Sequence, residues 1–298
     1  MALACSIGIM AHNEAANVGR LLKRLRGQRT ANVTITEIVV VASGCTDQTE
    51  SIVQRRAQRD PRIRLLVQPQ REGKASAINQ FLRDAREKIV VLCGADLLPA
   101  EDAVEQLVAP FVDSDLGMTG ARPVPVNDPN TFMGFAAHML WDLHHQVNLT
   151  SFKAGELVAL RKIFERIPYH TAVDEASIEP VIRGQGYSVK YIPSALVYNK
   201  GPETVKDFLS QRRRIYAGHL AVRKLLGYSV STMSGRKVLG IVIRNLQMQP
   251  RPFLWTWAVA ALEVYGRSLG FRDYLKRRDH SVWEIAKSTK DIGFRKTA

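Results

Sequence analysis

The sequence predicts an α/β protein with a Rossmann-like, doubly wound and mostly parallel sheet, followed by a C-terminal helical extension. Short apolar runs alternate with helical patterns through most of the chain, which is typical of β-α-β units. The run at residues 89–93 has no polar break, as expected for a strand that a parallel sheet buries on both faces. Residues 203–298 are rich in Arg and Lys and show mainly helical spacing.

The composition is that of a folded protein with an anionic partner. Hydrophobic residues make up 46% of the chain and the net charge is +14, which favours a nucleotide, a nucleic acid or an anionic membrane surface as the partner. Cys5, Cys45 and Cys93 lack metal-ligand spacing, so free thiols in a reducing compartment are expected. We find no signal peptide and no apolar stretch of the ~20 residues that span a bilayer, so a cytoplasmic protein is expected.

The first part of the chain is expected to alternate regularly. Strands are expected at residues 5–10, 37–41, 62–67 and 89–93. A helix follows each of them, and the fourth is expected over about residues 100–113. Asn13 is the expected N-cap of the first helix, which carries apolar residues at helical spacing at Val18, Leu21, Leu22 and Leu25.

The second part begins with a strand at 117–121 and a helix over 131–149. In that helix His138, Trp141 and His145 share one face, which indicates a helix beside an acceptor cleft or, less favoured, a metal pair of histidines. The remaining expected elements are a strand over 152–161, a helix from 173, a strand over 186–193, a basic helix over 203–226 and an apolar helix over 253–262.

Charged residues stand where strands end and helices begin. Asp96 follows the strand at 89–93, where open α/β sheets bind ligands, so it is a candidate cation ligand or a simple helix cap. Lys74 begins a helix, although helix N-termini favour anions, which indicates an anion-binding corner. Asp174 and Glu175 also begin a helix, where they complement its dipole or supply a general base.

The order and spacing of these motifs over residues 5–218 resemble the family 2 glycosyltransferases of the GT-A fold. Residues 10–14 resemble that family's P-x-x-N-E motif, with Met10 in place of Pro. Residues 42–47 resemble its D-D-G-S-T-D turn, with only Asp47 kept among the acids. Residues 73–79 resemble G-K-x-x-A-x-N, and residues 94–99 resemble D-A-D-x-x-P with Gly94 in place of the first Asp.

Two later motifs continue the resemblance. Asp174 and Glu175 resemble the E-D base motif in reversed order; residue type selects Asp174, whereas spacing selects Glu175. Residues 211–215 resemble Q-x-x-R-W with Ile215 in place of Trp. Asn199 stands where many relatives carry a metal-binding His, so with Gly94 the expected metal site is sparse.

The resemblance implies an inverting transfer of a hexose from a nucleotide sugar, with a UDP-sugar favoured, to a lipid-linked or saccharide acceptor in glycolipid or exopolysaccharide synthesis. Asp174 or Glu175 would be the base, and Asp96 would hold Mg²⁺ or Mn²⁺. The implied nucleotide-sugar residues are Asn13, Glu14, Asp47, Lys74, Asp96, Gln211 and Arg214. The implied acceptor residues are Trp141, His145, Gly155 and Glu156.

The expected domains are a GT-A domain at 1–202 and a basic helical extension at 203–298. Trp255, Trp257 and the basic residues 276–278 fit a helix that lies on an anionic membrane, which would place a peripheral enzyme at the cytoplasmic face. The same helix could instead pack on its own domain or form a dimer interface.

Three other functions were weighed. The acids missing at Ala42, Ser43 and Gly94 allow a catalytically inactive scaffold that binds a nucleotide sugar. The positive charge allows nucleic-acid binding, but no basic stripe on a known module supports it, so no nucleic-acid partner is expected. A nucleotidyltransferase would need a Gly- and Arg-rich loop after the first strand, where the chain has His12-Asn13-Glu14.

Overall fold

The computed structural model describes residues 2–169, 171–280, 282 and 287–293. Its strands are β1 (Leu3–Ala11), β2 (Val33–Ser43), β3 (Ile63–Gln68), β4 (Ile89–Gly94), β5 (Leu98–Pro99), β6 (Leu116–Pro125), β7 (Leu157–Arg161) and β8 (Ser188–Asn199). Its α-helices are α1 (Val18–Arg26), α2 (Thr49–Ala57), α3 (Lys74–Asp84), α4 (Ala103–Val108), α5 (Phe132–Asn148), α6 (Asp174–Gly184), α7 (Val205–Leu226), α8 (Gly235–Arg244) and α9 (Pro250–Leu275).

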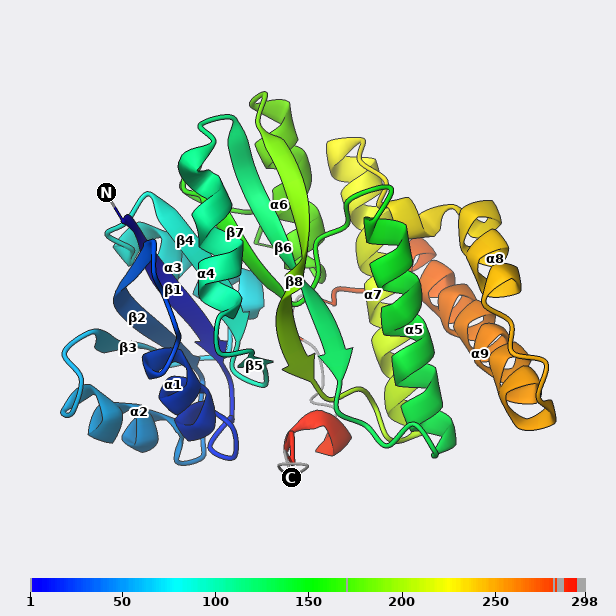
Figure 1. Ribbon diagram of the computed structural model, residues 1–298. Helices are drawn as coiled ribbons and strands as arrows, with labels where there is room; N and C mark the ends of the chain where they lie inside the picture. Colours follow the sequence, from blue (N-terminus) through cyan, green and yellow to red (C-terminus); the bar gives the residue numbers. More distant parts are fainter. Residues whose placement is uncertain (1, 170, 281, 283–286, 294–298) are drawn as a thin grey trace.

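One eight-stranded sheet runs through the molecule in the order β3-β2-β1-β4-β7-β6-β8-β5 (Figure 1). Strands β1 to β4 pair in parallel, as do β6 and β8, which confirms the mostly parallel α/β fold. Strand β7 runs antiparallel to both of its neighbours, and the short β5 runs antiparallel to β8. The carboxyl ends of β1, β2 and β4 therefore meet at one edge, where ligands bind in such sheets.

Helices cover both faces of the sheet, which explains the unbroken apolar strands. Along β2, Ile38 and Val40 pack with α1, α2 and α4, whereas Val39 and Val41 pack with α3 and α6 on the other face. Because successive strand residues point to opposite faces, a polar residue anywhere in such a strand would be buried. Strands β1, β2 and β4 are therefore packed on both faces, which fixes the position of their carboxyl ends.

Several expected boundaries are wrong. The strand expected over 152–161 begins only at Leu157, and the strand expected to end at residue 193 continues to Asn199 as β8. The helix expected over 100–113 is α4, followed by a 3₁₀ turn at Ala109–Val112. The last helix, expected over 253–262, is α9, which extends to Leu275.

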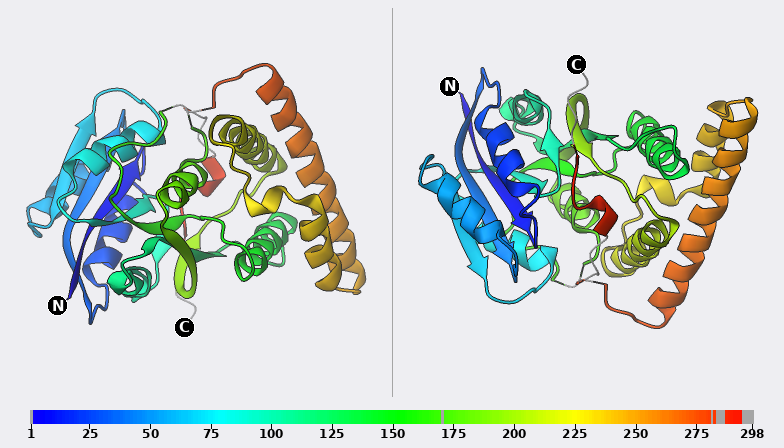
Figure 2. Two further views of the ribbon diagram at one scale, coloured as in Figure 1. Left: turned by 90° about the horizontal axis from the view of Figure 1, so that it is seen from above. Right: turned by 90° about the horizontal axis from the view of Figure 1, so that it is seen from below.

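The helical extension packs on two helices of the sheet domain: α7 contacts α6, and α8 and α9 contact α5 (Figure 2). Helix α9 lies closely against α7, because a side chain added at Gly270 would lie 2.5 Å from the backbone oxygen of Arg213. Arg213 also binds Asp273 of α9, and Arg212 pairs with Glu263 of α9 at 2.9 Å. The basic run of α7 is therefore partly neutralised inside the protein.

The outer face of α9 is apolar. Glu263 is turned toward α7, where it pairs with Arg212, so it does not interrupt this face. The exposed large apolar residues of α9 are Leu254, Trp257, Val264, Tyr265, Phe271 and Leu275. Among the described residues, no helix is both long and apolar enough to cross a membrane.

Candidate active site

The ends of β1 and β2 form a corner held together by Asn13 and Asp47. Asn13 has a positive φ of 53°, and its side-chain oxygen accepts a hydrogen bond from the backbone of Thr46 at 2.8 Å. Asp47 accepts hydrogen bonds from the backbone of Ala15 at 3.0 Å and of Thr49 at 2.9 Å. The prediction that Asn13 caps α1 is wrong, because Asn17 occupies the N-cap position.

Glu14 lies buried in this corner. Its carboxylate accepts a hydrogen bond from Asn17 at 2.9 Å and pairs with Lys290 from the distant C-terminal segment. Burial and the nearby charge of Asp96 raise the pKa of Glu14 to about 7, while Lys290 opposes that shift. The ends of β1 and β4 thus bring Glu14 and Asp96 into one electrostatic environment.

Asp96 follows β4 without capping a helix, because α4 begins only at Ala103, after Asp102. A side chain added at Gly94 would lie 2.7 Å from Oδ1 of Asp96, so glycine leaves room for this carboxylate. The described residues contain no group of three His, Cys, Asp or Glu side chains arranged to hold a metal. A single carboxylate still fits a hard cation whose other ligands come from a bound diphosphate and water.

The first residue of α3 and the first two residues of α6 form a charge cluster. The Lys74 ammonium lies 2.7 Å from Oδ2 of Asp174 and 2.8 Å from Oε1 of Glu175. The sequence predicts an anion at the N-terminus of α3, and in the structure this anion is the pair of carboxylates of Asp174 and Glu175. Although burial acts to lower it, the pKa of Lys74 is raised well above its usual value by the two acids.

The two carboxylates differ in environment. The side chain of Asp174 is 3% exposed and that of Glu175 is 21% exposed. Burial raises the pKa of Asp174, against the opposing charge of Lys74. Its Oδ1 atom is buried and has no hydrogen-bond partner, whereas Oδ2 is held by Lys74. A carboxylate with one oxygen anchored and the other unsatisfied is suited to accept a hydrogen bond from a bound hydroxyl.

Glu156 and Arg214 complete the cluster. Burial and the charges of Asp96 and Glu175 raise the pKa of Glu156 to about 7, so these acids lie near one another. Arg214 donates to the backbone oxygen of Ala172 at 3.0 Å, just before α6, and its charge acts on Glu156. Gln211 lies one helical turn before Arg214 on α7.

The predicted acceptor residues on α5 have other partners. His145 forms a 2.8 Å hydrogen bond with the Tyr191 hydroxyl, and Trp141 packs against His144. His138 bonds the backbone oxygen of Asn127 at 2.9 Å, so each of the two histidines has one ring nitrogen occupied, and the less favoured metal pair stays a prediction. Gly155 packs against α5, because a side chain there would lie 3.2 Å from the His144 ring.

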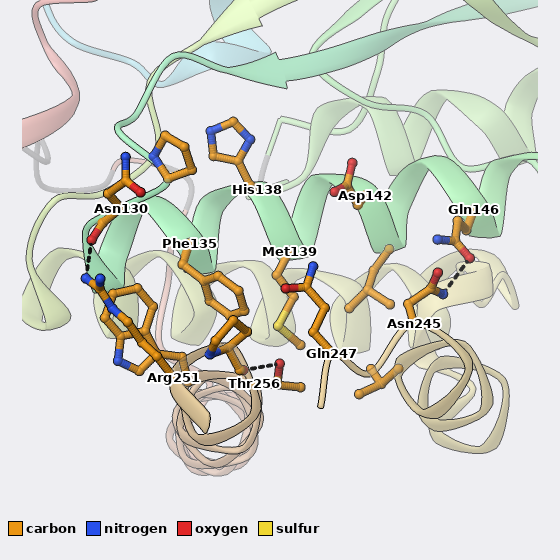
Figure 3. Close-up of a pocket in the computed structure, with 15 residues that line it drawn as sticks. Asn130, Phe135, His138, Met139, Asp142, Gln146, Asn245, Gln247, Arg251 and Thr256 are labelled. Carbon is orange, nitrogen blue, oxygen red and sulfur yellow. Dashed lines mark hydrogen bonds between the residues drawn. The ribbon is translucent and has the colours of Figure 1, made fainter. Parts of the chain in front are cut away.

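A cavity of about 580 Å³ lies between α5, α8 and α9 (Figure 3). Its walls include Phe135, Met139 and Trp255, together with amide groups such as Gln146 and Asn245. The Arg251 guanidinium stacks 4.2 Å from the centre of the Trp255 ring. Of the candidate residues on α5, His138 lines this cavity, whereas Lys74, Asp174 and Glu175 do not, so the cavity is separate from the charge cluster.

Sequence reasoning missed two lysines of the site. Burial and the charges of Arg212 and Arg267 lower the pKa of Lys153 to about 8, and Glu175 is among the acids that act on it. A lysine between Phe152 and Ala154 in an apolar segment was the available signal. Lys290 gave no signal, because its contact with Glu14 joins residues at opposite ends of the chain.

Known proteins resemble this chain in sequence. It is 29% identical over 149 residues to a dolichyl-phosphate beta-glucosyltransferase of Trichomonas vaginalis, an alignment that covers 44% of each chain. It is 24% identical over 214 residues to the poly-beta-1,6-N-acetyl-D-glucosamine synthase of Staphylococcus aureus, which covers 67% of this chain and 51% of the synthase. The chain thus spans about half the length of the curated relatives it matches.

Solved structures share the fold. A mannosyltransferase from Pyrobaculum calidifontis, in complex with GDP-Man and Mn²⁺, superposes with a TM-score of 0.59 at 22% identity and covers 93% of this chain and 83% of its own. Glucosyl-3-phosphoglycerate synthase from Mycobacterium tuberculosis, with Mn²⁺, UDP and phosphoglyceric acid, superposes with a TM-score of 0.53 at 18% identity and covers 74% and 78%. These likenesses identify the GT-A fold.

The family model named Glycosyl transferase family 2 matches residues 6–180, which is more than half of the chain. The matched range contains the corner at the ends of β1 and β2, Asp96, and the Lys74 cluster with Asp174 and Glu175. This chain is therefore a member of glycosyl transferase family 2.

Proposed function

We propose that the protein is an inverting glycosyltransferase that moves a hexose from a nucleotide sugar, with a UDP-sugar favoured, to a lipid-linked or saccharide acceptor in glycolipid or exopolysaccharide synthesis. The observation that carries the proposal is the buried Asp174 carboxylate, with Lys74 on one oxygen and no partner on the other. The solved relatives bind GDP-Man or UDP, which supports a nucleotide-sugar donor.

The reaction follows from the cluster. The acceptor hydroxyl donates its hydrogen bond to Oδ1 of Asp174, which takes the proton as the acceptor oxygen forms a bond to the anomeric carbon. The bond from that carbon to the diphosphate breaks on the opposite face, so configuration is inverted and no covalent intermediate is needed. Lys74 holds Asp174 in place, and Glu175 is the second candidate base at the same helix start.

The donor lies between the corner and α7 in this proposal. Asn13, Glu14 and Asp47 surround the nucleoside, and Arg214 with Gln211 faces the diphosphate, because a guanidinium forks onto phosphate oxygens. Asp96 would hold Mg²⁺ or Mn²⁺, the ions found with the solved relatives. When bound, such an ion would supply Lewis-acid neutralisation of the charge on the departing diphosphate.

Gly155 and Glu156 are the proposed acceptor-side residues nearest the base, because the charge of Glu175 acts on Glu156. Roles for Trp141 and His145 stay predictions. A lipid-linked acceptor is supported by α8 and α9, which border the separate cavity of Figure 3. The same two helices carry exposed apolar side chains.

We place the enzyme at the cytoplasmic face of a membrane, with the outer face of α9 on anionic lipid. Large exposed apolar patches mark interaction surfaces, and tryptophan favours the headgroup region. Arg272 and the basic residues 276–278 lie beside the apolar face and fit lipid phosphates. The three cysteines are free, which suits a reducing compartment.

The membrane proposal is tested by sedimentation with vesicles of phosphatidylcholine alone or with phosphatidylglycerol. Trp257→Glu should reduce binding to the anionic vesicles, because it places a charge in the apolar contact. Val112→Glu is the matched control, since Val112 is 81% exposed and lies away from α9. Equal binding of both variants, or a wild-type dimer that Trp257→Glu dissociates, would contradict the membrane role.

The donor is tested by calorimetry with UDP, GDP and dTDP, with and without Mn²⁺, beside Asp96→Ala. Binding of UDP that needs Mn²⁺ and is lost in Asp96→Ala is the expected result. Binding of GDP alone would change the donor class, and binding of no nucleotide by the wild type would contradict the proposed function.

A further inference from the structure

The segment 287–293, called the strap below, crosses the donor side of the molecule and lies between the β1–β3 part of the sheet and α7 (Figure 2). At one end the Ser288 hydroxyl donates to the Asp207 carboxylate at 2.5 Å, in the first turn of α7. At the other end the backbone of Ile292 donates to Asn17 at 3.4 Å, and the Ile292 side chain is 3% exposed. The strap is thus anchored to the start of α7 and to the N-cap of α1. The N-cap of α1 lies beside the corner formed by the ends of β1 and β2, which is called the nucleotide corner below.

Lys290 projects from the middle of the strap into that corner. Its ammonium pairs with the Glu14 carboxylate and donates to the backbone oxygen of His12 at 3.0 Å. The side-chain amide of Asn17 donates to the backbone oxygen of Lys290 and to Glu14. Asn17 therefore orients both Lys290 and Glu14 and fixes the geometry of their ion pair.

The charge of Lys290 acts on much of the corner. Burial acts to raise the pKa of Asp47, but hydrogen bonds from Thr49 and Ala15 together with Lys290 lower it. Lys290 also opposes the effect of burial and of Asp96 on Glu14. Glu14, Asp47 and Asp96 thus gather in one corner, and an unpaired buried carboxylate there would repel a negatively charged ligand.

We propose that Lys290 is a positioning residue of the nucleotide-sugar site: by pairing with Glu14 it reduces the negative potential that a nucleoside diphosphate meets in this corner. The inference rests on the proposed function, because it assumes that the corner receives the nucleotide. It adds a residue outside the region that the family model matches. A strap that merely occluded the corner would have the opposite effect, since removing its lysine would strengthen binding.

The test is calorimetry of UDP and of uridine with Mn²⁺, using the full chain with Lys290→Met, Lys290→Arg and Lys23→Met. Lys23 is an exposed lysine of α1, so its loss controls for net charge. Loss of Lys290 raises the pKa of Glu14 further, so binding is measured at pH 9, where Glu14 is more fully ionised, and there the unpaired charge should weaken UDP binding about tenfold in Lys290→Met. Lys290→Arg should keep most of the affinity, Lys23→Met should match the wild type, and neutral uridine should be little affected.

A double variant separates positioning from a structural role. In a Glu14→Gln background no carboxylate is left unpaired, so adding Lys290→Met should cause little further loss of UDP affinity. If UDP affinity is unchanged or higher in Lys290→Met, or if uridine binding falls by the same factor, the inference is wrong while the proposed function stands. If the wild type binds no nucleotide, both are wrong.

Discussion

Replacement of Asp174 by Asn tests the assignment of the base. The change keeps the shape of the side chain, but it removes the basic oxygen that has no partner in the structure. Lys74 keeps Glu175 as a partner at 2.8 Å, so the ammonium is not left isolated in the cluster. The fold and the nucleotide corner should therefore survive the change.

The expected effect is a fall of kcat by about 10³-fold, within the 10²–10⁴ that a positioned general base contributes. That fall corresponds to about 4 kcal/mol of activation free energy. Glu175→Gln should reduce kcat less, because the Glu175 side chain is more exposed and its resolved partner is Lys74. Because burial raises the pKa of Asp174, wild-type kcat should rise with pH through a limb above the ordinary aspartate range.

The assay is release of the nucleoside diphosphate from the nucleotide sugar that calorimetry identifies, in the presence of acceptor. Nucleotide affinity and melting temperature are measured on the same proteins, with Glu179→Gln as a control carboxylate on α6. If Asp174→Asn retains more than about a tenth of kcat while Glu175→Gln loses nearly all of it, the assignment of the base to Asp174 is refuted.

Three further predictions concern the packing of α7, α8 and α9. Hydrogen bonds from Arg213 lower the pKa of Asp273, so this pair stabilises the fold above the unfolded value of about 3.9 and loses its contribution as pH falls below it. Asp273→Asn should lower the free energy of unfolding by roughly 2 kcal/mol at pH 7 and by much less near pH 3, measured by urea denaturation. Gly270→Ala should destabilise by about 1–3 kcal/mol, because its side chain meets the backbone of α7. Gly240→Ala in α8, where nothing lies within 4 Å, should instead stabilise by about 0.5–1 kcal/mol, and equal melting temperatures for the two variants would contradict this packing argument.

The sequence was sufficient to predict the alternation of strands and helices and the edge at which the acids gather. Unbroken apolar runs such as residues 89–93 occur where both faces of a strand are covered, and the packing of β4 confirms this. Strand β7 runs antiparallel, which its apolar residues 157–160 could not reveal, because the same run suits either direction.

The site was only partly predictable. Asp174 and Glu175 were found because both acids lie in the first turn of one helix, but their shared partner Lys74 lies a hundred residues earlier in the chain. A run of arginines does not reveal which of them turn inward, so the partners of Arg212 and Arg213 on α9 were missed. Lys290 contacts Glu14 across 276 residues, a distance over which spacing carries no information.

The three adjacent arginines of α7 connect helix α9, at the surface, with the start of α6, where the charge cluster lies. Arg212 and Arg213 form ion pairs with α9, while Arg214, within the same turn, donates to the backbone oxygen of Ala172, just before the helix that carries the proposed base. A displacement of α9 would therefore act on the turn of α7 that carries Arg214. If α9 attaches to a lipid surface as proposed, kcat should change on attachment even when the acceptor is free in solution.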